Sequence, residues 1–284
     1  IERIVEIRKK VPDIELEVFI HGALCYSFSG LCLASGMILD RSGNRGECAQ
    51  ICRSYYDMDG RDGYYFSCND LVLKEKIRLL VDAGINSLKI EGRMKSPQYV
   101  FHTAALYRSI LDNRDHTGFL KMSRISFSRK ETTGYFSSFS GTELVNSLYP
   151  GHRGIRLGTC EKVQNGRFLI KLREPLSIRD GIMFFKGNDE RHPVNCGVEE
   201  ILTVSGKSLK KVASGERVFI RIEHVPQKED TIFLTSSRDS DMKKVNPASF
   251  KRWKKKIDIS VSIKSKKVEI SCGTFVFYEE ILRL

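Results

Sequence analysis

Two short strand patterns place the strongest limit on the fold of this chain, because each is apolar on one side only. Residues 15–21 and 85–91 alternate between apolar and polar side chains, which is typical of β-strands. Their polar sides carry Glu17, His21, Lys89 and Glu91. A doubly wound sheet buries both sides of its strands, so this pattern favours a barrel in which the polar sides line a site. Edge strands with one side in water would produce the same pattern.

Helical patterns alternate with these strands. We expect helices over residues 1–11, over residues 69–83 with Gly84 as the stop signal, and after the capping pair Ser96-Pro97. A strand–helix–strand–helix order is typical of parallel βα units. Residues 1–120 are therefore predicted to form part of a TIM-like (β/α) barrel, with an irregular loop over residues 22–66.

The length of this region is too small for a whole barrel. A complete barrel takes roughly 250 residues, whereas about 115 residues of this chain precede a change to a β-rich pattern. We therefore expect a preceding N-terminal segment or a partner chain to complete the barrel.

The remainder of the chain reads as a linker followed by an all-β domain. Residues 121–150 are expected to be the linker, and residues 151–284 a β-rich domain. The dipeptide Asn165-Gly166 lies between two apolar runs and predicts a tight hairpin turn. Further glycine-containing turns separate short strands, which favours a small antiparallel β-barrel or sandwich.

The charge of the chain favours an anionic partner. It carries 47 Lys and Arg against 35 Asp and Glu, a formal net charge of +12, which suits RNA. A basic segment over residues 243–256 contains aromatic residues that could stack on unpaired bases. A solvated surface is the alternative for this run. The predicted RNA-binding residues are Lys251, Arg252, Trp253, Lys254 and Lys255.

Apolar runs and cysteine usage bear on the compartment. No apolar run reaches the roughly 18 residues that a membrane span requires. The eight cysteines are not dense enough for a small disulfide-bonded secreted domain, and no secretory signal is visible. We therefore expect a cytoplasmic protein with reduced cysteines and no membrane partner.

Four cysteines lie within 28 residues of the irregular loop, at Cys25, Cys32, Cys48 and Cys52. Structural zinc sites usually take their ligands in close pairs, and the present spacing is looser. Four thiolates from one loop suit an iron–sulfur cluster, which accepts varied spacing. Zinc, or free buried cysteines that pack as small apolar residues, are the alternatives.

The sequence around these cysteines resembles peptidase family U32, the collagenase-like peptidase family. The resemblance is carried by residues 17–35, which include Glu-Val-Phe-Ile-His-Gly-Ala-Leu-Cys, by residues 44–53, and by residues 85–97, which read Ile-Asn-Ser-Leu-Lys-Ile-Glu-Gly-Arg-Met-Lys-Ser-Pro. Residues 133–136, 151–158 and 180–182 are similar, more weakly, to the C-terminal extension of members that hydroxylate rRNA.

This resemblance implies an α/β plus all-β fold, in which the C-terminal portion of a TIM-like barrel is followed by a small antiparallel β-barrel domain. It implies a 4Fe-4S cluster and oxygen-independent hydroxylation of RNA, most closely of a cytidine in 23S rRNA, with prephenate as a co-substrate. Hydroxylation of a tRNA uridine or a quinone precursor, peptidase activity, and a non-catalytic half-barrel that assists a partner are the alternatives.

The resemblance and the strand positions together assign candidate roles. Cys25, Cys32, Cys48 and Cys52 are the expected metal ligands, with Cys68 in reserve for Cys52. Lys89, Arg93 and Lys95 are the expected substrate-binding residues, because basic side chains bind carboxylates. Glu91, Glu17 and His21 are the candidate catalytic residues for proton transfer. A peptidase is less well supported, because neither HExxH nor G-x-S-x-G occurs, although Cys25 and His21 could imitate a thiol–imidazole pair.

Overall fold

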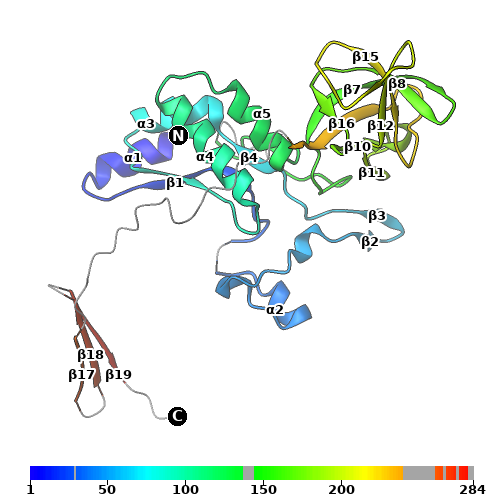
Figure 1. Ribbon diagram of the computed structural model, residues 1–284. Coiled ribbons are helices and arrows are strands. Elements are labelled where there is room, and N and C mark those ends of the chain that lie inside the picture. Colours follow the sequence, from blue (N-terminus) through cyan, green and yellow to red (C-terminus); the bar gives the residue numbers. More distant parts are fainter. Residues whose placement is uncertain (29, 137–143, 239–259, 265–266, 273–274, 281–284) are drawn as a thin grey trace. The chain divides into compact units, whose positions relative to one another are not determined.

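The computed structural model describes residues 1–28, 30–136, 144–238, 260–264, 267–272 and 275–280 (Figure 1). The chain divides into two compact units, Ile1–Asp241 and Met242–Leu284. The first unit contains a small mixed sheet with helices, a long cysteine-rich excursion and a larger antiparallel sheet, and the second contains three strands.

The small sheet has the strand order β5-β1-β4-β6. Strand β1 (Glu17–Ala23) pairs in parallel with β5 (Ser87–Ile90), as the βα pattern predicts. Strand β4 (Asp70–Val72) runs antiparallel to β1 on its other side and pairs in parallel with β6 (Glu131–Thr132). The sheet is therefore mixed, and the TIM-like barrel to which we assign it stays a prediction.

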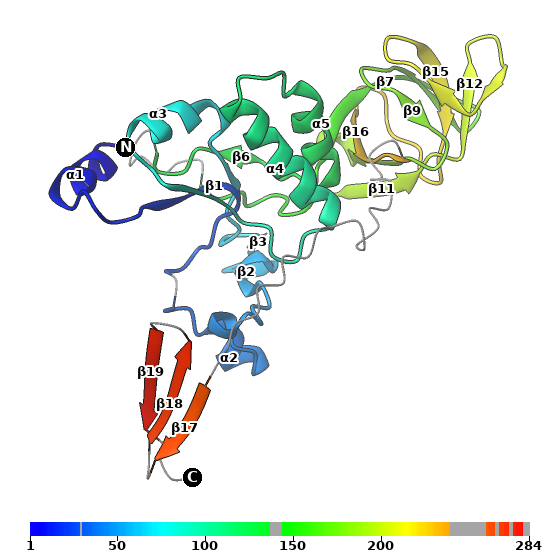
Figure 2. The ribbon, with the colours of Figure 1, turned by 60° about the vertical axis from the view of Figure 1, so that its left-hand side comes forward.

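Helices pack against this sheet through a compact apolar core. They are α1 (Glu2–Lys10), α3 (Ile77–Asp82), α4 (Pro97–Leu111) and α5 (Thr117–Ser126) (Figure 2). Ile20 of β1, Leu80 of α3 and Leu106 of α4 are completely buried in one cluster. Helix α4 begins as predicted, because the Ser96 hydroxyl accepts the Tyr99 N–H at 3.2 Å and Pro97 occupies the first turn.

The predicted helix over residues 69–83 is wrong in its first half. Residues 70–72 form strand β4, a 3₁₀ turn covers Lys74–Lys76, and only Ile77–Asp82 is α-helical. A short apolar run fits a strand as well as a helix, so periodicity alone could not separate them. The stop at Gly84 is confirmed, since its φ of 79° lies in the left-handed region.

The cysteine-rich stretch between β1 and β4 contains only short elements. These are helix α2 (Ala34–Leu39), 3₁₀ turns over Gly43–Arg45 and Ile51–Arg53, and the hairpin of β2 (Tyr56–Met58) and β3 (Arg61–Gly63). Figures 1 and 2 both show this stretch extending away from the small sheet. The irregular loop predicted over residues 22–66 therefore carries more local structure than expected.

Residues 121–150, expected to be a linker, belong in large part to the first region. Helix α5 continues to Ser126, and β6 adds a strand to the small sheet. Thr103 of α4 and Ser123 of α5 are both buried, and their hydroxyls form a 2.8 Å hydrogen bond. The sequence pattern does not reveal the regular structure of this segment, because strand β6 is only two residues long.

The larger sheet has eight antiparallel strands in the order β11-β10-β16-β7-β8-β15-β12-β13. It curls around an apolar core in which Phe168, Ile220 and Ile232 are completely buried (Figure 2). Strands β9 and β14 form a separate antiparallel pair. The strands are β7 (Ile155–Gln164), β8 (Arg167–Lys171), β9 (Leu176–Ser177), β10 (Gly181–Phe185), β11 (Pro193–Gly197), β12 (Glu200–Thr203), β13 (Ser208–Leu209), β14 (Lys211–Val212), β15 (Arg217–Arg221) and β16 (Thr231–Ser236).

The predicted Asn165-Gly166 hairpin is confirmed. Both residues have positive φ, 51° and 68°, as a tight turn between twisted strands requires. Gln164 of β7 pairs with Arg167 of β8 directly across the turn. An antiparallel β domain is therefore confirmed, but its two end strands, β11 and β13, do not pair with each other, so the described sheet is not a closed barrel.

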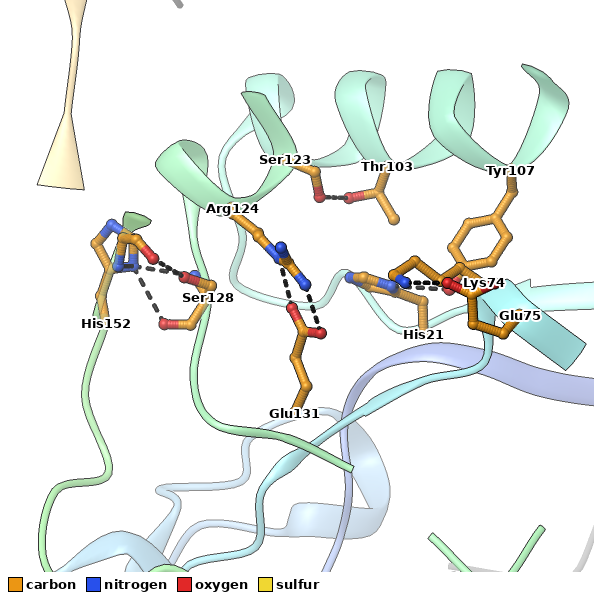
Figure 3. A network of polar contacts seen from close by, with 11 residues as sticks. His21, Lys74, Glu75, Thr103, Tyr107, Ser123, Arg124, Ser128, Glu131 and His152 are labelled. Carbon is orange, nitrogen blue, oxygen red and sulfur yellow. Dashed lines mark hydrogen bonds and ion pairs between the residues drawn. The ribbon is translucent and has the colours of Figure 1, made fainter. Parts of the chain in front are cut away.

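His152 joins the helical region to the larger sheet. Its Nε2 lies 2.9 Å from the carbonyl oxygen of Thr235, and its Nδ1 lies 2.9 Å from the backbone nitrogen of Ser128. Its ring stacks on Phe127 at a centroid distance of 5.3 Å. Figure 3 shows His152 beside Ser128, below the end of α5. This side chain fixes the start of the β domain against the helix that precedes it.

The second unit contains one antiparallel sheet of β17 (Ser260–Lys264), β18 (Lys267–Cys272) and β19 (Phe275–Glu280). The basic segment 243–256 and the predicted RNA-binding residues 251–255 lie outside the described residues. Among the helices that are described, none has both the length and the apolar character needed to cross a bilayer.

Candidate functional site

A pocket of about 860 Å³ lies where the parallel strands β1 and β5 end. Residues just after β1, just after β5 and from the cysteine-rich stretch all line it. The carboxyl ends of parallel strands are the usual position of ligand sites in α/β proteins. The four cysteines predicted as ligands, Cys25, Cys32, Cys48 and Cys52, all line this one pocket.

Three of the predicted ligands, Cys25, Cys32 and Cys48, act electrostatically on the fourth, Cys52. Burial is the main cause that raises the pKa of Cys52, and the adjacent Arg53 lowers it. Cys25, Cys48 and Cys32 each raise the pKa of Cys52 further, because a second thiolate nearby disfavours the first. The predicted ligands therefore line one pocket and influence Cys52, while their role as metal ligands stays a prediction.

The metal that the four cysteines would hold stays a prediction. Within the described part of the chain, no group of three or more His, Cys, Asp or Glu is close enough to hold one metal ion. Four ligands of one zinc ion would have to meet at about 2.3 Å from a common point. In a 4Fe-4S cluster each cysteine binds a different iron, so the sulfurs stand farther apart. The four cysteines line one pocket and provide the four thiolates that such a cluster binds, so the donor chemistry is compatible with the prediction.

Cys48 already accepts hydrogen bonds. Its sulfur lies 3.3 Å from the backbone nitrogen of Gln50 and 4.0 Å from the Ser35 hydroxyl. Ser35 is buried, and its oxygen also accepts the N–H of Ala49 at 3.1 Å. Donors aimed at a sulfur stabilise the thiolate form that binds metal. Sequence reasoning missed Ser35, because nothing in its spacing marks it as a partner of Cys48.

Cys68, the reserve ligand, takes a different position. It is buried with 7% of its surface exposed and does not line the pocket. Burial raises the pKa of its thiol, and Cys52 and Cys25 raise it further. Its carbonyl oxygen accepts a 2.7 Å hydrogen bond from Nη1 of Arg53. These observations favour Cys52 over Cys68 as the fourth ligand.

Arg53 ties the pocket wall to the sheet. Its Nη1 also donates to the Ser67 hydroxyl at 3.0 Å, and its Nη2 donates to the carbonyl oxygen of Leu24 at 3.3 Å. All these acceptors are neutral, so the guanidinium charge is not cancelled by direct pairing with them. Sequence reasoning did not single out Arg53, although it directly follows Cys52.

The turn after β5 forms the opposite wall of the pocket. Glu91 Oε1 accepts the backbone N–H of Arg93 at 2.9 Å, and the N–H of Lys95 donates to the Gly92 carbonyl at 3.0 Å. Gly22 of β1 allows this turn to approach closely, because a Cβ at Gly22 would lie 2.3 Å from the Glu91 carbonyl oxygen. Glu91, predicted to be catalytic, therefore lines the pocket while also bracing its wall.

Lys95 is a half-buried cation of the same wall. Its Nζ lies over the Phe127 ring, 3.0 Å from the centroid. Burial lowers the pKa of Lys95 to about 8, and the charge of Arg129 lowers it further. Lys95 and Arg93 both line the pocket, so two of the three predicted substrate-binding residues lie there, and their role stays a prediction.

Lys89 and Glu17 lie apart from the pocket. Lys89 Nζ pairs with Glu17 Oε1 at 3.0 Å and lies 4.8 Å from the centroid of the Phe19 ring. The Ser87 hydroxyl and Lys89 lower the pKa of Glu17, and both charged side chains are about half exposed. Neither residue lines the pocket, so the interpretation of Lys89 as a substrate clamp and of Glu17 as a catalytic group gains no support from their positions.

His21 lies in a buried polar network beside the pocket rather than in its lining (Figure 3). Its Nδ1 lies 3.0 Å from the Tyr107 hydroxyl, which donates its proton to the Ile20 carbonyl. The tautomer of His21 sets which of the two groups donates in this pair. Figure 3 shows the imidazole directed toward the ion pair of Arg124 and Glu131. Burial lowers the pKa of His21 to about 4, only partly offset by Asp70 and Glu131.

This environment predicts a pH effect on stability. Above pH 6.5 the His21 imidazole is neutral in both the folded and the unfolded chain. Between about pH 6.5 and about pH 4 the imidazole is protonated in the unfolded chain but stays neutral in the folded chain, so the folded state loses stability. We expect His21 to remove about 3 kcal/mol of folding free energy as the pH falls from about 6.5 to about 4. Urea unfolding should show His21→Gln losing less stability than wild type over this interval. An equal loss in the two proteins would contradict the prediction.

The fold and site define an α/β protein with a cysteine-lined pocket at the ends of its parallel strands. The sequence profile of peptidase family U32 matches residues 1–146, just over half of the chain. The chain belongs to peptidase family U32.

Three curated relatives show the range of names in this family. A tRNA hydroxylation protein of Bacillus subtilis is 43% identical over 120 residues, which cover 38% of this chain and 28% of the relative. A 23S rRNA 5-hydroxycytidine synthase of Escherichia coli is 32% identical over 194 residues, which cover 61% of this chain and 30% of the relative. An uncharacterized protease of Methanocaldococcus jannaschii is 30% identical over 258 residues, which cover 80% of this chain and 61% of the relative. The chain therefore spans less than a third of the two RNA-modification relatives.

Proposed function

We propose that this chain is part of an iron–sulfur-dependent, oxygen-independent RNA hydroxylase. The observation that carries the proposal is the convergence of four cysteines on one pocket at the ends of β1 and β5. Relatives named for tRNA hydroxylation and for 23S rRNA hydroxycytidine synthesis match 38% and 61% of this chain, and the family profile matches the region that forms this pocket. Free thiols are a stable state in the cytoplasm, where we place the protein.

In this proposal Cys25, Cys32, Cys48 and Cys52 hold a 4Fe-4S cluster. The cluster supplies one-electron chemistry without molecular oxygen. Hydrogen bonds from Ser35 and Gln50 support the Cys48 thiolate. Arg53, whose hydrogen bonds go to neutral acceptors, contributes a positive charge next to the Cys52 thiol.

The inner cations suit an acidic co-substrate, which we propose to be prephenate. Lys95 and Arg53 are half-buried and line the same pocket as Glu91. Two cations against one carboxylate favour a ligand that carries carboxylate groups. Lys95 replaces Lys89 in this role, because Lys89 pairs with Glu17 outside the pocket.

Within RNA, we propose a cytidine of 23S rRNA as the target. The Escherichia coli rRNA synthase matches 61% of this chain, a larger share than the family profile covers. The Bacillus subtilis tRNA hydroxylation protein matches only 38%. The rRNA relative therefore shares more of this chain, including residues beyond the family region. Hydroxylation of a tRNA uridine is the second candidate.

A peptidase is the alternative that the family name suggests. A cysteine peptidase needs a thiol and an imidazole within hydrogen-bond reach. Cys25 is exposed in the pocket, whereas Nδ1 of His21 forms a hydrogen bond with the Tyr107 hydroxyl in a buried network outside the pocket lining. This arrangement disfavours Cys25 and His21 as the catalytic thiol–imidazole pair of a peptidase.

Mass spectrometry of nucleosides from purified rRNA and tRNA would test the proposal. In a strain that lacks the gene, a hydroxylated cytidine should disappear from 23S rRNA and return when the full-length protein is supplied. Loss of a hydroxylated uridine from tRNA would transfer the assignment to the second candidate. Unchanged nucleosides in both RNAs would contradict RNA hydroxylation.

A further inference from the structure

The rim of the cysteine pocket exposes large apolar side chains. Phe28 is 81% exposed, Leu31 is 73% exposed and Met94 is 83% exposed, and all three line the pocket. Phe28 and Leu31 come from the cysteine-rich stretch, whereas Met94 comes from the turn after β5. Apolar side chains exposed around a pocket are typical of a surface that contacts a ligand or a partner.

The backbone at Met94 is strained in a way that holds its side chain on this rim. Its φ is 61°, in the left-handed region that a long side chain rarely adopts. Glu91 and Gly92 brace the turn through hydrogen bonds to the backbone of Arg93 and Lys95. Such conformations persist where the surrounding structure fixes them, and they cluster at ligand sites.

The rim is apolar and positively charged together. Arg93 is exposed and precedes Met94, while Lys95 follows it and turns inward toward Phe127. Glu91 is the acidic residue of the pocket lining, and one of its carboxylate oxygens is bound to the Arg93 N–H. The apolar side chains of Phe28 and Met94 can contact a nucleobase, and the exposed Arg93 can bind the phosphate of the same nucleotide.

We propose that this rim receives one unpaired nucleotide of the RNA, with its base against Phe28 and Met94 and its phosphate on Arg93. The inference rests on the proposed function and adds the place at which the RNA enters. A base inside a duplex cannot reach a pocket, so the enzyme binds a nucleotide that is already unpaired or is flipped out. Arg93 is exposed, so we assign it to the RNA phosphate, whereas Lys95 and Arg53 are half-buried and are assigned to the acidic co-substrate.

Binding of a short RNA that carries unpaired cytidines to the full-length protein, loaded with its cluster, tests this inference. We expect Phe28→Ala to weaken binding about tenfold, the scale of one lost base–aromatic stacking contact. Met94→Gly should weaken binding about tenfold through the loss of an apolar contact with the base. Met94→Gly removes the side chain without disturbing the turn, because glycine adopts positive φ freely. Arg93→Gln should reduce the slope of log K against log salt by about 0.7.

Val163→Ala and Lys207→Gln are the matched controls, because both residues are exposed and lie in the larger sheet region away from the pocket. They should bind RNA as wild type does. Iron content should be unchanged in all five variants.

The outcomes separate the inference from the proposed function. If wild type holds no cluster or modifies no RNA, the proposed function fails. If wild type holds the cluster and modifies RNA while the Phe28 and Met94 variants bind as wild type does, only the present inference is overturned. If instead these variants change the oligomeric state in sedimentation and leave RNA binding intact, the rim is a protein interface and the inference is again overturned.

Discussion

Replacement of Cys48 by serine should abolish the bound cluster and RNA hydroxylation together. We expect iron to fall from about four atoms per chain to fewer than one, because a hydroxyl does not replace a thiolate ligand. Changes in groups that merely support a ligand reduce metal affinity or activity about 10- to 100-fold, so loss of a ligand should exceed that range. Iron and sulfide analysis of anaerobically purified full-length protein, with nucleoside mass spectrometry, checks this expectation.

Two further variants make the cysteine experiment specific. Cys196→Ala removes a thiol from β11, where it is buried in the core of the larger sheet, and should keep all the iron. Cys68→Ser compares the reserve ligand with Cys52 and should retain the cluster, because Cys68 does not line the pocket. Full iron content in Cys48→Ser, or loss of iron in Cys68→Ser but not in Cys52→Ser, would contradict the proposed ligand set.

Replacement of Arg129 by methionine should produce a large loss of stability. Arg129 Nη1 pairs with Asp70 Oδ1 at 3.0 Å, and their side chains are only 9% and 7% exposed. Arg129 Nε also donates to the Pro150 carbonyl at 2.6 Å. Removing one partner leaves a buried charge uncompensated, which costs about 3–5 kcal/mol. Urea unfolding should show this loss in the free energy of unfolding.

A surface pair provides the control for this experiment. Arg191 pairs with Asp189 at 2.7 Å, but their side chains are 58% and 32% exposed. Arg191→Met should change the free energy of unfolding by no more than about 1 kcal/mol, because water screens exposed pairs. Adding Asp70→Asn to Arg129→Met should restore part of the loss. Equal small effects at Arg129 and Arg191 would show that burial is not decisive here.

The elements that the sequence predicts best are those with a local physical cause. Ser96 and Pro97 define the start of α4, because a side-chain cap and a fixed proline φ act within one turn. Asn165-Gly166 defines the first hairpin of the larger sheet, because both positions require positive φ. Strands β1 and β5 and their parallel pairing also follow from alternation and connection order, although the predicted one-sided burial fails in β1, where Ile20, His21 and Gly22 are all buried.

The errors occur where long-range pairing decides the structure. Residues 70–72 join the sheet as β4 because β1 and β6 lie on either side of them, not because of their own pattern. The two residues of β6 carry no strand signal by themselves. Lys89 and Glu91 share one polar side of a strand in the sequence, yet Lys89 pairs with Glu17 outside the pocket and Glu91 lines it.

The sequence by itself determined the family, the candidate ligand set and the positive charge, because spacing and residue chemistry are properties of the chain. Only the tertiary structure decided that Cys52 rather than Cys68 faces the pocket. It also decided that Ser35 donates a hydrogen bond to the Cys48 sulfur and that Arg53 donates one to the Cys68 carbonyl. It also placed His21 in a buried network beside the pocket. The reason is that burial and partner geometry depend on segments far apart in the chain, and local sequence patterns do not encode them.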